Sequence, residues 1–349
     1  MKTAVVILNW NGLQHLQHYL PRVVATTHDA DIVVADNGST DGSVAWLCRT
    51  MPAVKLVLLD KNYGFAEGYN RALAQLEGYD TFVLFNSDIE PTEGWLSPLV
   101  EQLEKNPDVA VVVPKILDDK CREKFEYAGA AGGFIDLLGY PFCRGRILNC
   151  VERDCGQYDT SRDVMWGSGA AFCCRAKVFA ELGGFADEFF AHQEEIDLCW
   201  RVWLSGRRVV VEPRSKVYHL GGATLSADSP FKTMLNHRNN LAMLYRCAPA
   251  GQRLLVAVVR PVLDFLAALS YLVQGKRQSA KAVWTAWCDF LKWHKRLSAE
   301  RKAIRCNVKG EAPVYYGSVV VRYMLGKKIY RGLDERKNNF NYKKTMANG

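Results

Sequence analysis

The sequence predicts an α/β protein with a mostly parallel central sheet, followed by a helical and basic C-terminal region. Short β-branched apolar runs alternate with stretches of helical composition through the first hundred residues. This alternation is typical of βαβ units, in which helices cover both faces of a parallel sheet. Charge also divides the chain, because residues 1–245 carry a net charge of −7 and residues 246–349 a net charge of +15. The two parts are therefore expected to differ in structure and in what they contact.

Six apolar runs are predicted to be strands, at residues 4–8, 31–35, 54–59, 81–85, 109–114 and 208–211. Helical composition is found at residues 13–25, 43–51, 66–76, 175–182 and 194–204. The stretch 118–164 is rich in glycine, cysteine and aromatic residues without a clear period, so we expect an irregular insertion that shapes an acceptor site. Ligands of parallel sheets bind beyond the carboxyl ends of the strands, and the polar loops found there are 9–12, 36–41, 61–64 and 86–90.

The length of 349 residues exceeds a typical single domain of roughly 100–200 residues. We predict a catalytic domain over 1–225, a helical region over 226–305 and a basic tail over 306–349. The odd number of 11 cysteines, without a repeated metal-type pair, predicts reduced thiols. The apolar run after Met1 is too short for the core of a signal peptide. We therefore expect a cytoplasmic protein, in peripheral contact with the inner face of the cytoplasmic membrane.

Two segments of the basic region bear on membrane contact. Residues 254–273 are apolar and long enough to span a bilayer, but Arg260, Pro261 and Asp264 lie in their middle and disfavour spanning. Residues 276–305 mix tryptophans with lysines and arginines, which is typical of a helix in the plane of the lipid headgroups. The alternative is a basic helix packed on the catalytic domain. An anionic membrane surface is thus an expected partner, whereas nucleic acid is not, because no nucleic-acid-binding module accompanies the charge.

The loops after the first two strands carry groups suited to a nucleotide. Asp36 opens the loop 36–41 at the end of a buried strand, and a carboxylate held there suits the imide N–H of a pyrimidine base. The alternative is an Asx turn with a helix cap. Asn37 follows Asp36, and Asn9 and Asn11 lie in the loop after the first strand. We assign all four residues to nucleotide-sugar binding.

The segment 61–71 joins a loop to a helix with small residues in its first turns. Gly64 permits a close approach of the backbone, Asn62 is a polar neighbour, and Arg71 offers a cation toward a nucleotide. The alternative is that the glycines only let the helix pack on the sheet.

Asn86, Ser87 and Asp88 follow the apolar run 81–85, which aims them at the same sheet edge. Mg²⁺ and Mn²⁺ prefer oxygen ligands, so one carboxylate and two phosphate oxygens suffice to hold such an ion. We predict Asp88 as a metal ligand and assign Asn86 and Ser87 to nucleotide-sugar binding. A turn without an ion is the alternative.

Glu194, Glu195 and Asp197 stand at the start of a predicted helix, where the helix dipole favours carboxylates. Asp197 and Arg201 are four residues apart and can form an ion pair. Glu195 shares its face with apolar residues, which indicates a general base rather than a surface charge. Glu194 and Asp197 are the further candidates for that role, and simple capping by all three is the alternative.

Two cationic candidates lie further along the chain. His219 follows a short strand and precedes a glycine pair, so it is a candidate metal ligand or phosphate donor. Arg238 offers a cation toward a diphosphate. For both residues a purely structural role is the alternative.

Taken together and in order, these motifs resemble glycosyltransferase family 2 enzymes of the Rossmann-like A fold, in particular the bacterial rhamnosyltransferase-like branch. The matching segments are 5–12, 34–41, 62–66, 86–88, 183–185, 194–199 and 218–219. The resemblance implies a nucleotide-diphosphate sugar donor linked to dTDP, UDP or GDP, Mg²⁺ or Mn²⁺, and inversion at the anomeric carbon. It also implies a glycan or lipid-linked acceptor, in the synthesis of cell-surface polysaccharide.

The resemblance implies that Asp36 contacts the base, Asp88 the metal, and His219 the metal or diphosphate. Two departures stand out. Glu195 occupies the position where the family usually has the aspartate base, and Asn86 replaces the first acid of the metal triplet. These departures keep open an A-fold domain that binds nucleotide sugar or membrane without turnover. A nucleotidyltransferase is the second alternative, although the loop 9–12 lacks the Gly-rich, basic phosphate loop that such an enzyme would carry after its first strand.

Overall fold

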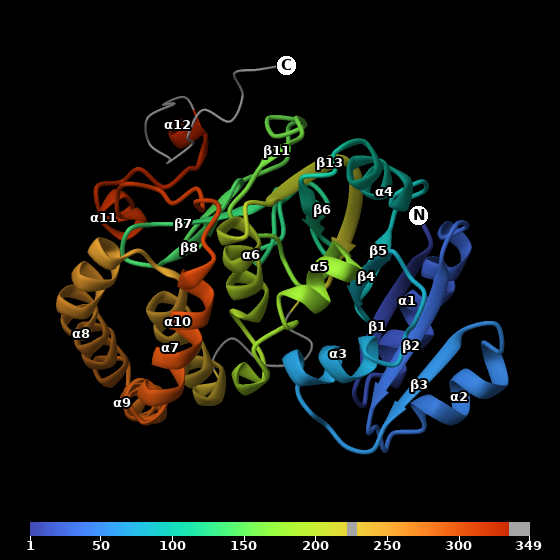
Figure 1. Ribbon diagram of the computed structural model, residues 1–349, viewed down its shortest axis with the longest axis horizontal. Coiled ribbons are helices and arrows are strands. Elements are labelled where there is room, and N and C mark those ends of the chain that lie inside the picture. The colour runs from blue at the N-terminus through green and yellow to red at the C-terminus, as the bar shows by residue number, and fades with distance from the viewer. Residues whose placement is uncertain (222–228, 335–349) are drawn as a thin grey trace.

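A nine-stranded mixed sheet forms the centre of the protein (Figure 1). The computed structural model describes residues 1–221 and 229–334. Eight strands follow the order β11-β13-β6-β12-β4-β1-β2-β3, and β5 pairs with β13. The strands are β1 Thr3–Asn9, β2 Asp31–Asn37, β3 Lys55–Leu59, β4 Thr81–Asn86, β5 Ile89–Pro91, β6 Val109–Asp118, β11 Arg162–Asp163, β12 Ala171–Arg175 and β13 Arg208–His219.

The predicted parallel sheet is confirmed for β4-β1-β2-β3 and for β6 with β13. Strand β12 was not predicted, and it lies between the two parallel parts, antiparallel to both β4 and β6. Its pairing brings the residues before Ala171 to the carboxyl end of β4, where Asn86 N donates to Ala170 O at 2.9 Å. A chain segment remote in sequence therefore reaches the edge at which β1, β2 and β4 end.

Apolar side chains on alternate sides of each strand explain why helices cover both faces. In β1, Val5 and Ile7 belong to one hydrophobic cluster, and Ala4 and Val6 belong to the other. The first cluster includes the helices α1 Leu13–Thr26, α2 Ser43–Thr50 and α4 Leu96–Lys105. The second includes α3 Ala66–Leu73, α5 Ala176–Glu181 and α6 Glu194–Leu204. Of these, α4 was not predicted.

The stretch predicted to be irregular contains a second, four-stranded sheet of order β10-β9-β8-β7. Its strands are β7 Gly133–Ile135, β8 Pro141–Cys143, β9 Arg146–Ile147 and β10 Cys150–Val151. Runs of two or three residues are too short to show a period of two, so the sequence carried no strand signal there. Phe134 and Phe142 are fully buried, which makes the insertion part of the core.

The C-terminal helices pack beside the sheet, at the left in Figure 1. They are α7 Pro230–Cys247, α8 Ala250–Val273, α9 Arg277–Lys292, α10 His294–Cys306, α11 Val319–Met324 and α12 Arg331–Asp334. The stretch 276–305, predicted as one helix, is therefore two. By length and composition α8 is the one helix among the described residues that could cross a membrane, and only 17% of its apolar window is buried.

The C-terminal region shares its core with the sheet. Met243 and Leu244 of α7 join the same hydrophobic cluster as α3 and α6. Tyr330 is fully buried against Phe134 and Phe142 at ring distances of 6.1 Å. The predicted boundary at 225/226 and the last part of the predicted tail, 335–349, lie outside the described residues.

Candidate active site

The loops after β1 and β2 are joined by hydrogen bonds around Asp36. Asn9 Nδ2 donates to Asp36 Oδ1 at 3.0 Å and to Ser39 Oγ at 3.1 Å, and Ser39 N donates to Asp36 Oδ2 at 2.9 Å. Asn11 completes the contact, because its Oδ1 accepts from Thr40 N at 2.7 Å. Asp36 and Asn9 are buried, and Asn9 Oδ1 has no partner among the described residues. The structure thus brings three predicted residues into one rigid, acceptor-rich corner.

Asn37 connects this corner to the loop after β3. Its Nδ2 donates to Asn62 Oδ1 at 3.1 Å and to Gly64 O at 2.9 Å, and its Oδ1 accepts from Tyr63 N at 3.0 Å. Gly64 has a φ of +77°, and a Cβ there would lie 2.5 Å from the ring of Phe190. Glycine is therefore required where this loop meets the segment that leads into α6.

Arg71 does not join the site as predicted. Its side chain is 49% exposed on α3, pairs with Glu67 at 2.7 Å and lies over the ring of Tyr63 at 3.9 Å. This is a surface i, i+4 pair, which satisfies the guanidinium locally.

Arg238 is also corrected, because it is buried in a structural role. Its guanidinium donates to the carbonyl oxygens of Glu188 at 3.1 Å and Phe189 at 3.3 Å, and it stacks on Trp293 at 4.4 Å. The neighbouring Asn239, which sequence reasoning missed, donates to the carbonyls of three residues of the same segment at 2.8–3.0 Å, and these residues are Phe189, Ala191 and His192. Helix α7 therefore clamps the segment before α6 and offers no free cation through Arg238.

Helix α6 begins after a strained segment. Phe190, His192 and Gln193 all have a positive φ, of 63°, 69° and 74°. Such conformations cost on the order of 1 kcal/mol each and persist only where the surroundings enforce them. The clamp from α7 provides that enforcement, and it fixes where Glu194 and Glu195 stand.

Glu195 lies against the loop that leads into β12. A Cβ on Gly169 would be 3.6 Å from the Cβ of Glu195 and 3.2 Å from the ring of Phe65. Glu195 Oε2 is buried and has no partner among the described residues. Burial raises the pKa of Glu195 to about 7. A carboxyl with this pKa changes protonation near neutrality, as a general base must.

Glu194 and Asp197 are the further candidates for the base. Glu194 Oε2 is also buried without a partner among the described residues, and burial, and then the neighbouring charge of Glu195, raise the pKa of Glu194 well above its usual value. Asp197 is fully buried, and its Oδ2 accepts from Arg201 at 2.8 Å and from Arg246 at 3.0 Å. The predicted pair with Arg201 is confirmed, whereas the predicted catalytic role of Asp197 is corrected, because both guanidinium groups hold its carboxylate in the core.

Asp88 and His219 meet at the adjoining strand ends. His219 Nε2 lies 3.3 Å from Asp88 Oδ1 and 3.5 Å from Asn86 Nδ2, and Leu220 N donates to Asp88 O at 3.1 Å. Ser87 lies beside the loop that follows β1, because its Oγ would be 3.7 Å from a Cβ built on Gly12. The triplet predicted at 86–88 therefore stands beside the Asn9 corner.

Glu126 belongs to this group, although no sequence motif pointed to it. Its Oε1 lies 3.5 Å from His219 Nδ1. Burial acts to lower the pKa of His219, but the two carboxylates outweigh it and raise that pKa to about 10. His219 in turn keeps the pKa of Asp88 below its usual value despite burial. Glu126 lies in the predicted insertion, and the bridge of Phe125 to Leu117 of β6, with the hydrogen bond from Glu126 N to Ile116 O at 3.0 Å, brings it here.

Asp88 and His219 fit a divalent cation as a partial ligand set. Two adjacent octahedral ligands at about 2.1 Å from an ion are about 3 Å apart, close to the distance of 3.3 Å between Asp88 Oδ1 and His219 Nε2. Among the described residues no three His, Cys, Asp or Glu side chains converge as a metal site. The remaining ligands would come from diphosphate and water, as is usual for Mg²⁺.

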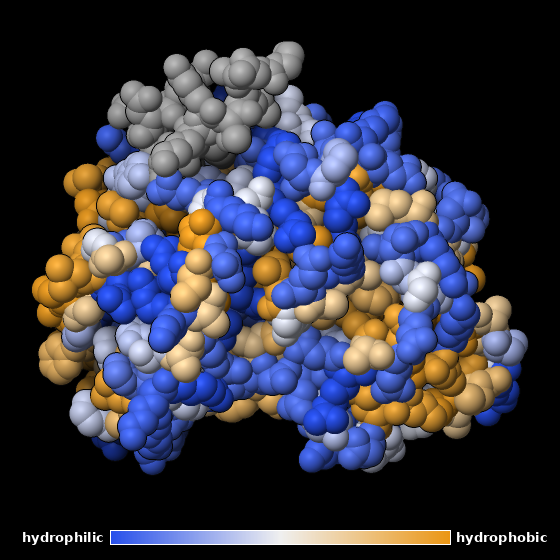
Figure 2. Space-filling view, in the orientation of Figure 1, coloured by the Kyte–Doolittle hydropathy of each residue, from blue (hydrophilic) through white to orange (hydrophobic). Residues whose placement is uncertain are grey.

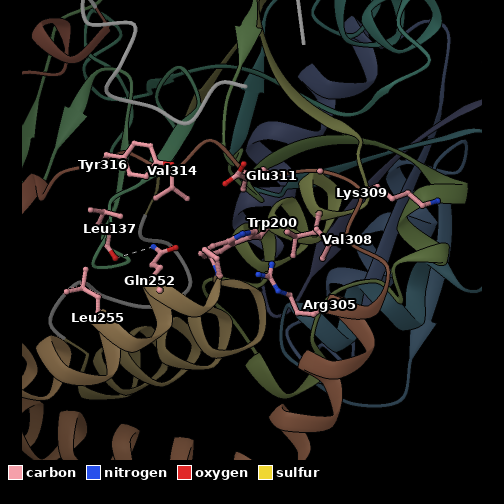
Figure 3. A pocket seen from close by; sticks show the side chains of 15 residues that line it. Leu137, Trp200, Gln252, Leu255, Arg305, Val308, Lys309, Glu311, Val314 and Tyr316 are labelled. Carbon is pink, nitrogen blue, oxygen red and sulfur yellow. Dashed lines mark hydrogen bonds between the residues drawn. The ribbon is translucent and has the colours of Figure 1, made fainter. Parts of the chain in front are cut away.

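A cavity of about 590 Å³ lies elsewhere, between α6, the start of α8 and the segment 308–316 (Figure 3). Trp200, Leu137 and Leu255 line it, and Gln252 donates to Leu137 O at 3.2 Å. None of the predicted site residues lines this cavity. In Figure 2 the surface is also hollowed at the lower edge, between the lobe of α7 to α9 and the lobe of β2 and β3.

Comparison with known proteins identifies the N-terminal part of the chain. A family model described as Glycosyl transferase family 2 matches residues 4–147. Residues 4–147 thus form a domain that matches glycosyl transferase family 2. The N-acetylglucosaminyl-diphospho-decaprenol L-rhamnosyltransferase of Mycobacterium tuberculosis is 26% identical over 258 residues, which are 69% of this chain and 83% of that protein. The O-antigen biosynthesis protein RfbC of Myxococcus xanthus is 26% identical over 202 residues, 57% of this chain and 16% of that protein.

Solved structures show that this glycosyltransferase has the A fold. The structure of S. aureus TarS 1–349 aligns with a TM-score of 0.55 at 15% identity and covers 93% of this chain and 92% of that one. GalNAc-T7, solved with UDP, GalNAc and Mn²⁺, aligns with a TM-score of 0.55 at 17% identity, covering 70% and 48%. The predicted fold and family are confirmed. Because the family match ends at residue 147, the roles of Glu195 and His219 depend on the geometry alone.

Proposed function

We propose that this glycosyltransferase moves a sugar from a nucleotide-diphosphate donor to an acceptor hydroxyl, with inversion at the anomeric carbon. One observation carries the proposal. Glu195, with a buried and unpartnered Oε2, lies against the loop beside β4, and β4 also leads to the pair of Asp88 and His219. The donors bound in neighbouring structures, namely UDP-GlcNAc and GDP-Man, support a nucleotide sugar in general, and dTDP-, UDP- and GDP-linked sugars are the candidates here.

The nucleotide would bind at the corner of Asp36, Asn9 and Asn37. Asp36 is held by two donors of the protein, so its carboxylate is fixed before a ligand arrives. A fixed acceptor orients an imide N–H without a further loss of side-chain entropy. Asn62 and Gly64 would shape the floor beneath the nucleotide, because Asn37 holds both of them.

The diphosphate would lie toward Asp88 and His219. A bound Mg²⁺ or Mn²⁺ would offset the negative charge that develops on the departing diphosphate. Asp88 and His219 would hold this ion, and Glu126 would orient the imidazole through its other ring nitrogen, 3.5 Å away. Asn86 and Ser87 are polar groups beside it and carry no charge that would repel phosphate.

Glu195 would act as the base. Its carboxylate accepts the proton of the acceptor hydroxyl, the acceptor oxygen bonds to the anomeric carbon, and the bond from that carbon to the diphosphate oxygen breaks. The nucleoside diphosphate then leaves with the bonding electron pair. The clamped segment 188–193 would set the position of the helix start, and with it the position of the Glu195 carboxylate.

The acceptor would be a glycan or lipid-linked hydroxyl in the synthesis of cell-surface polysaccharide. A relative that is named as a decaprenol-linked rhamnosyltransferase supports this class. The positive charge of the C-terminal region supports an enzyme that acts at the cytoplasmic face of an anionic membrane.

The test is nucleoside diphosphate release from a panel of sugar nucleotides with Mn²⁺ and candidate acceptors. We expect release that depends on acceptor and metal and that falls by about 10²- to 10⁴-fold in Glu195→Gln. Unchanged release in this variant would remove Glu195 from the base role.

The same assay separates the two alternatives. Pyrophosphate release from a nucleoside triphosphate would indicate a nucleotidyltransferase. Nucleotide-sugar binding without any product over many hours would indicate a domain that binds without turnover.

A further inference from the structure

Helix α8 is oriented with its polar side toward the protein and its apolar side toward solvent. Its four buried residues, spaced four apart, are Gln252, Val256, Arg260 and Asp264. Three of these are polar or charged. Its exposed side carries nine large apolar residues, which are Leu254, Leu255, Val258, Val262, Phe265, Leu266, Leu269, Leu272 and Val273. A helix on the surface of a water-soluble protein usually has its apolar side toward the protein and its polar side toward solvent.

The buried charges fix this orientation. Arg260 donates to Asn240 Oδ1 at 2.6 Å and to Leu138 O at 3.1 Å, and it pairs with Asp264 at 3.3 Å. Asp264 Oδ2 in turn accepts from Trp287 Nε1 of α9 at 3.0 Å. Rotating α8 to bury its apolar side would leave both charges without partners, so the apolar side stays outside.

The apolar surface continues beyond α8. Val321, Met324 and Leu325, in and just after α11, are 53%, 79% and 70% exposed, and Trp284 of α9 is 72% exposed. Figure 2 shows this surface as orange atoms along the left edge, where Figure 1 places α8 and α11. A contiguous apolar face of this kind marks a contact surface for a protein or a membrane.

The charges around this surface favour a membrane with anionic lipids. The exposed residues Arg277 and Lys281 follow α8, and Lys327 and Lys328 follow α11. Between residues 250 and 288 the one acidic residue is Asp264, which is buried. An apolar helix face with cations near it and no exposed acid between residues 250 and 288 is complementary to acyl chains beneath anionic headgroups.

We propose that α8 lies in the interface of an anionic phospholipid bilayer, with its apolar side among the upper acyl chains. It lies on the membrane rather than across it, because spanning would move Arg260 and Asp264 out of their contacts, at about 2.5–3.5 kcal/mol each. The sequence pointed to residues 276–305 as the membrane-surface segment, whereas the structure assigns the main contact to α8. The cavity of Figure 3 adjoins this face through Leu255.

The experiment is co-sedimentation of the full chain with extruded vesicles of phosphatidylcholine alone and of phosphatidylcholine with phosphatidylglycerol at about 3:1. Val262→Glu places a charge on the apolar side of α8. Leu58→Glu, on β3, is the matched control, because Val262 and Leu58 are both 59% exposed. Circular dichroism of each variant checks that it is folded.

We expect the protein to bind the anionic vesicles, less so at high salt, with a partition coefficient lowered about tenfold or more by Val262→Glu and unchanged by Leu58→Glu. The double variant Arg277→Gln and Lys281→Gln should weaken binding to the anionic vesicles only.

Three results would overturn the proposal. The first is no binding to vesicles of either composition, and the second is equal binding by Val262→Glu and the control. The third is a dimer in sedimentation velocity that Val262→Glu dissociates while vesicles bind neither form, since a second copy of the chain would then cover the face. Because no sugar nucleotide, acceptor or metal is present, these results stand apart from the test of sugar transfer.

Discussion

Replacing Glu195 by glutamine should make the enzyme more stable and inactive at the same time. The substitution keeps the shape of the side chain and removes its ability to ionise. In the wild type, Glu195 Oε2 is buried without a partner among the described residues, and burial raises its pKa from 4.5 to about 7. Ionising this group in the folded protein therefore costs free energy that ionising it in the unfolded chain does not.

The sign and size of the effect follow from that shift. A carboxyl whose pKa is raised by folding contributes its full stability below pH 4.5, and this contribution is lost as the pH rises through about 7. One pKa unit corresponds to about 1.4 kcal/mol, so the wild type loses about 3 kcal/mol from this group between acid and alkaline conditions. Glutamine has no such loss. Glu195→Gln should thus unfold like the wild type near pH 4.5 and be more stable by about 3 kcal/mol above pH 8.

Urea denaturation at several pH values measures the stability difference, and nucleoside diphosphate release measures activity. Glu77→Gln, an exposed glutamate, is the control and should change stability by less than about 0.5 kcal/mol at every pH. In the wild type, kcat/KM should rise with pH through about 7, because the base must be deprotonated. A stability difference that does not depend on pH, or an active Glu195→Gln enzyme, would refute the reasoning.

Three further predictions concern other parts of the site. Asp197→Asn should lower the free energy of unfolding by about 3–5 kcal/mol, seen as a large drop in the thermal midpoint, because its two buried arginine partners lose their counter-charge; a midpoint near that of the wild type would contradict the structural role. Gly64→Ala should reduce activity by about 10²-fold, because the new Cβ would meet the ring of Phe190. Gly183 has the same φ of +77° with nothing within 4 Å of a Cβ, so Gly183→Ala is the control and should stay active. Equal loss of activity in both variants would show that backbone strain alone is responsible. Chelation by EDTA should stop sugar transfer, and added Mn²⁺ should restore it in the wild type but not in Asp88→Asn. Product release follows the activity, and the Mn²⁺-dependent thermal shift with nucleoside diphosphate follows metal binding. A metal-dependent shift that survives in Asp88→Asn would show that Asp88 is not a metal ligand.

The sequence was informative wherever the signal is local. Apolar runs located β1, β2, β3 and β4 to within a few residues, and the loops after β1, β2 and β3 do meet around Asn9, Asp36 and Asn37. The spacing of Asp197 and Arg201 correctly predicted their ion pair. Each of these properties depends on residues close in the chain or on the fixed rule that parallel strands end at one edge.

Long-range packing decided the remaining features. Glu126 reaches His219 because the residues around it pair with the end of β6, and an isolated bridge of this kind leaves no period to recognise in the sequence. Arg71 and Arg238 look alike as cations in the sequence, yet one lies on the surface and the other is enclosed by carbonyl oxygens from a segment about fifty residues away. Such partners are absent from any local window of sequence.

The sequence by itself determined the resemblance to the family, the parallel strands β1 to β4 with their polar loops, and the basic character of the last third. Only the tertiary structure decided that the carboxylate of Asp197 is held by two arginines and which side of α8 faces outward. The physical reason is the same in both cases. A period along the chain shows that a helix has two different sides, but burial and the pairing of charges, as at Arg260 and Asp197, determine which side meets the protein.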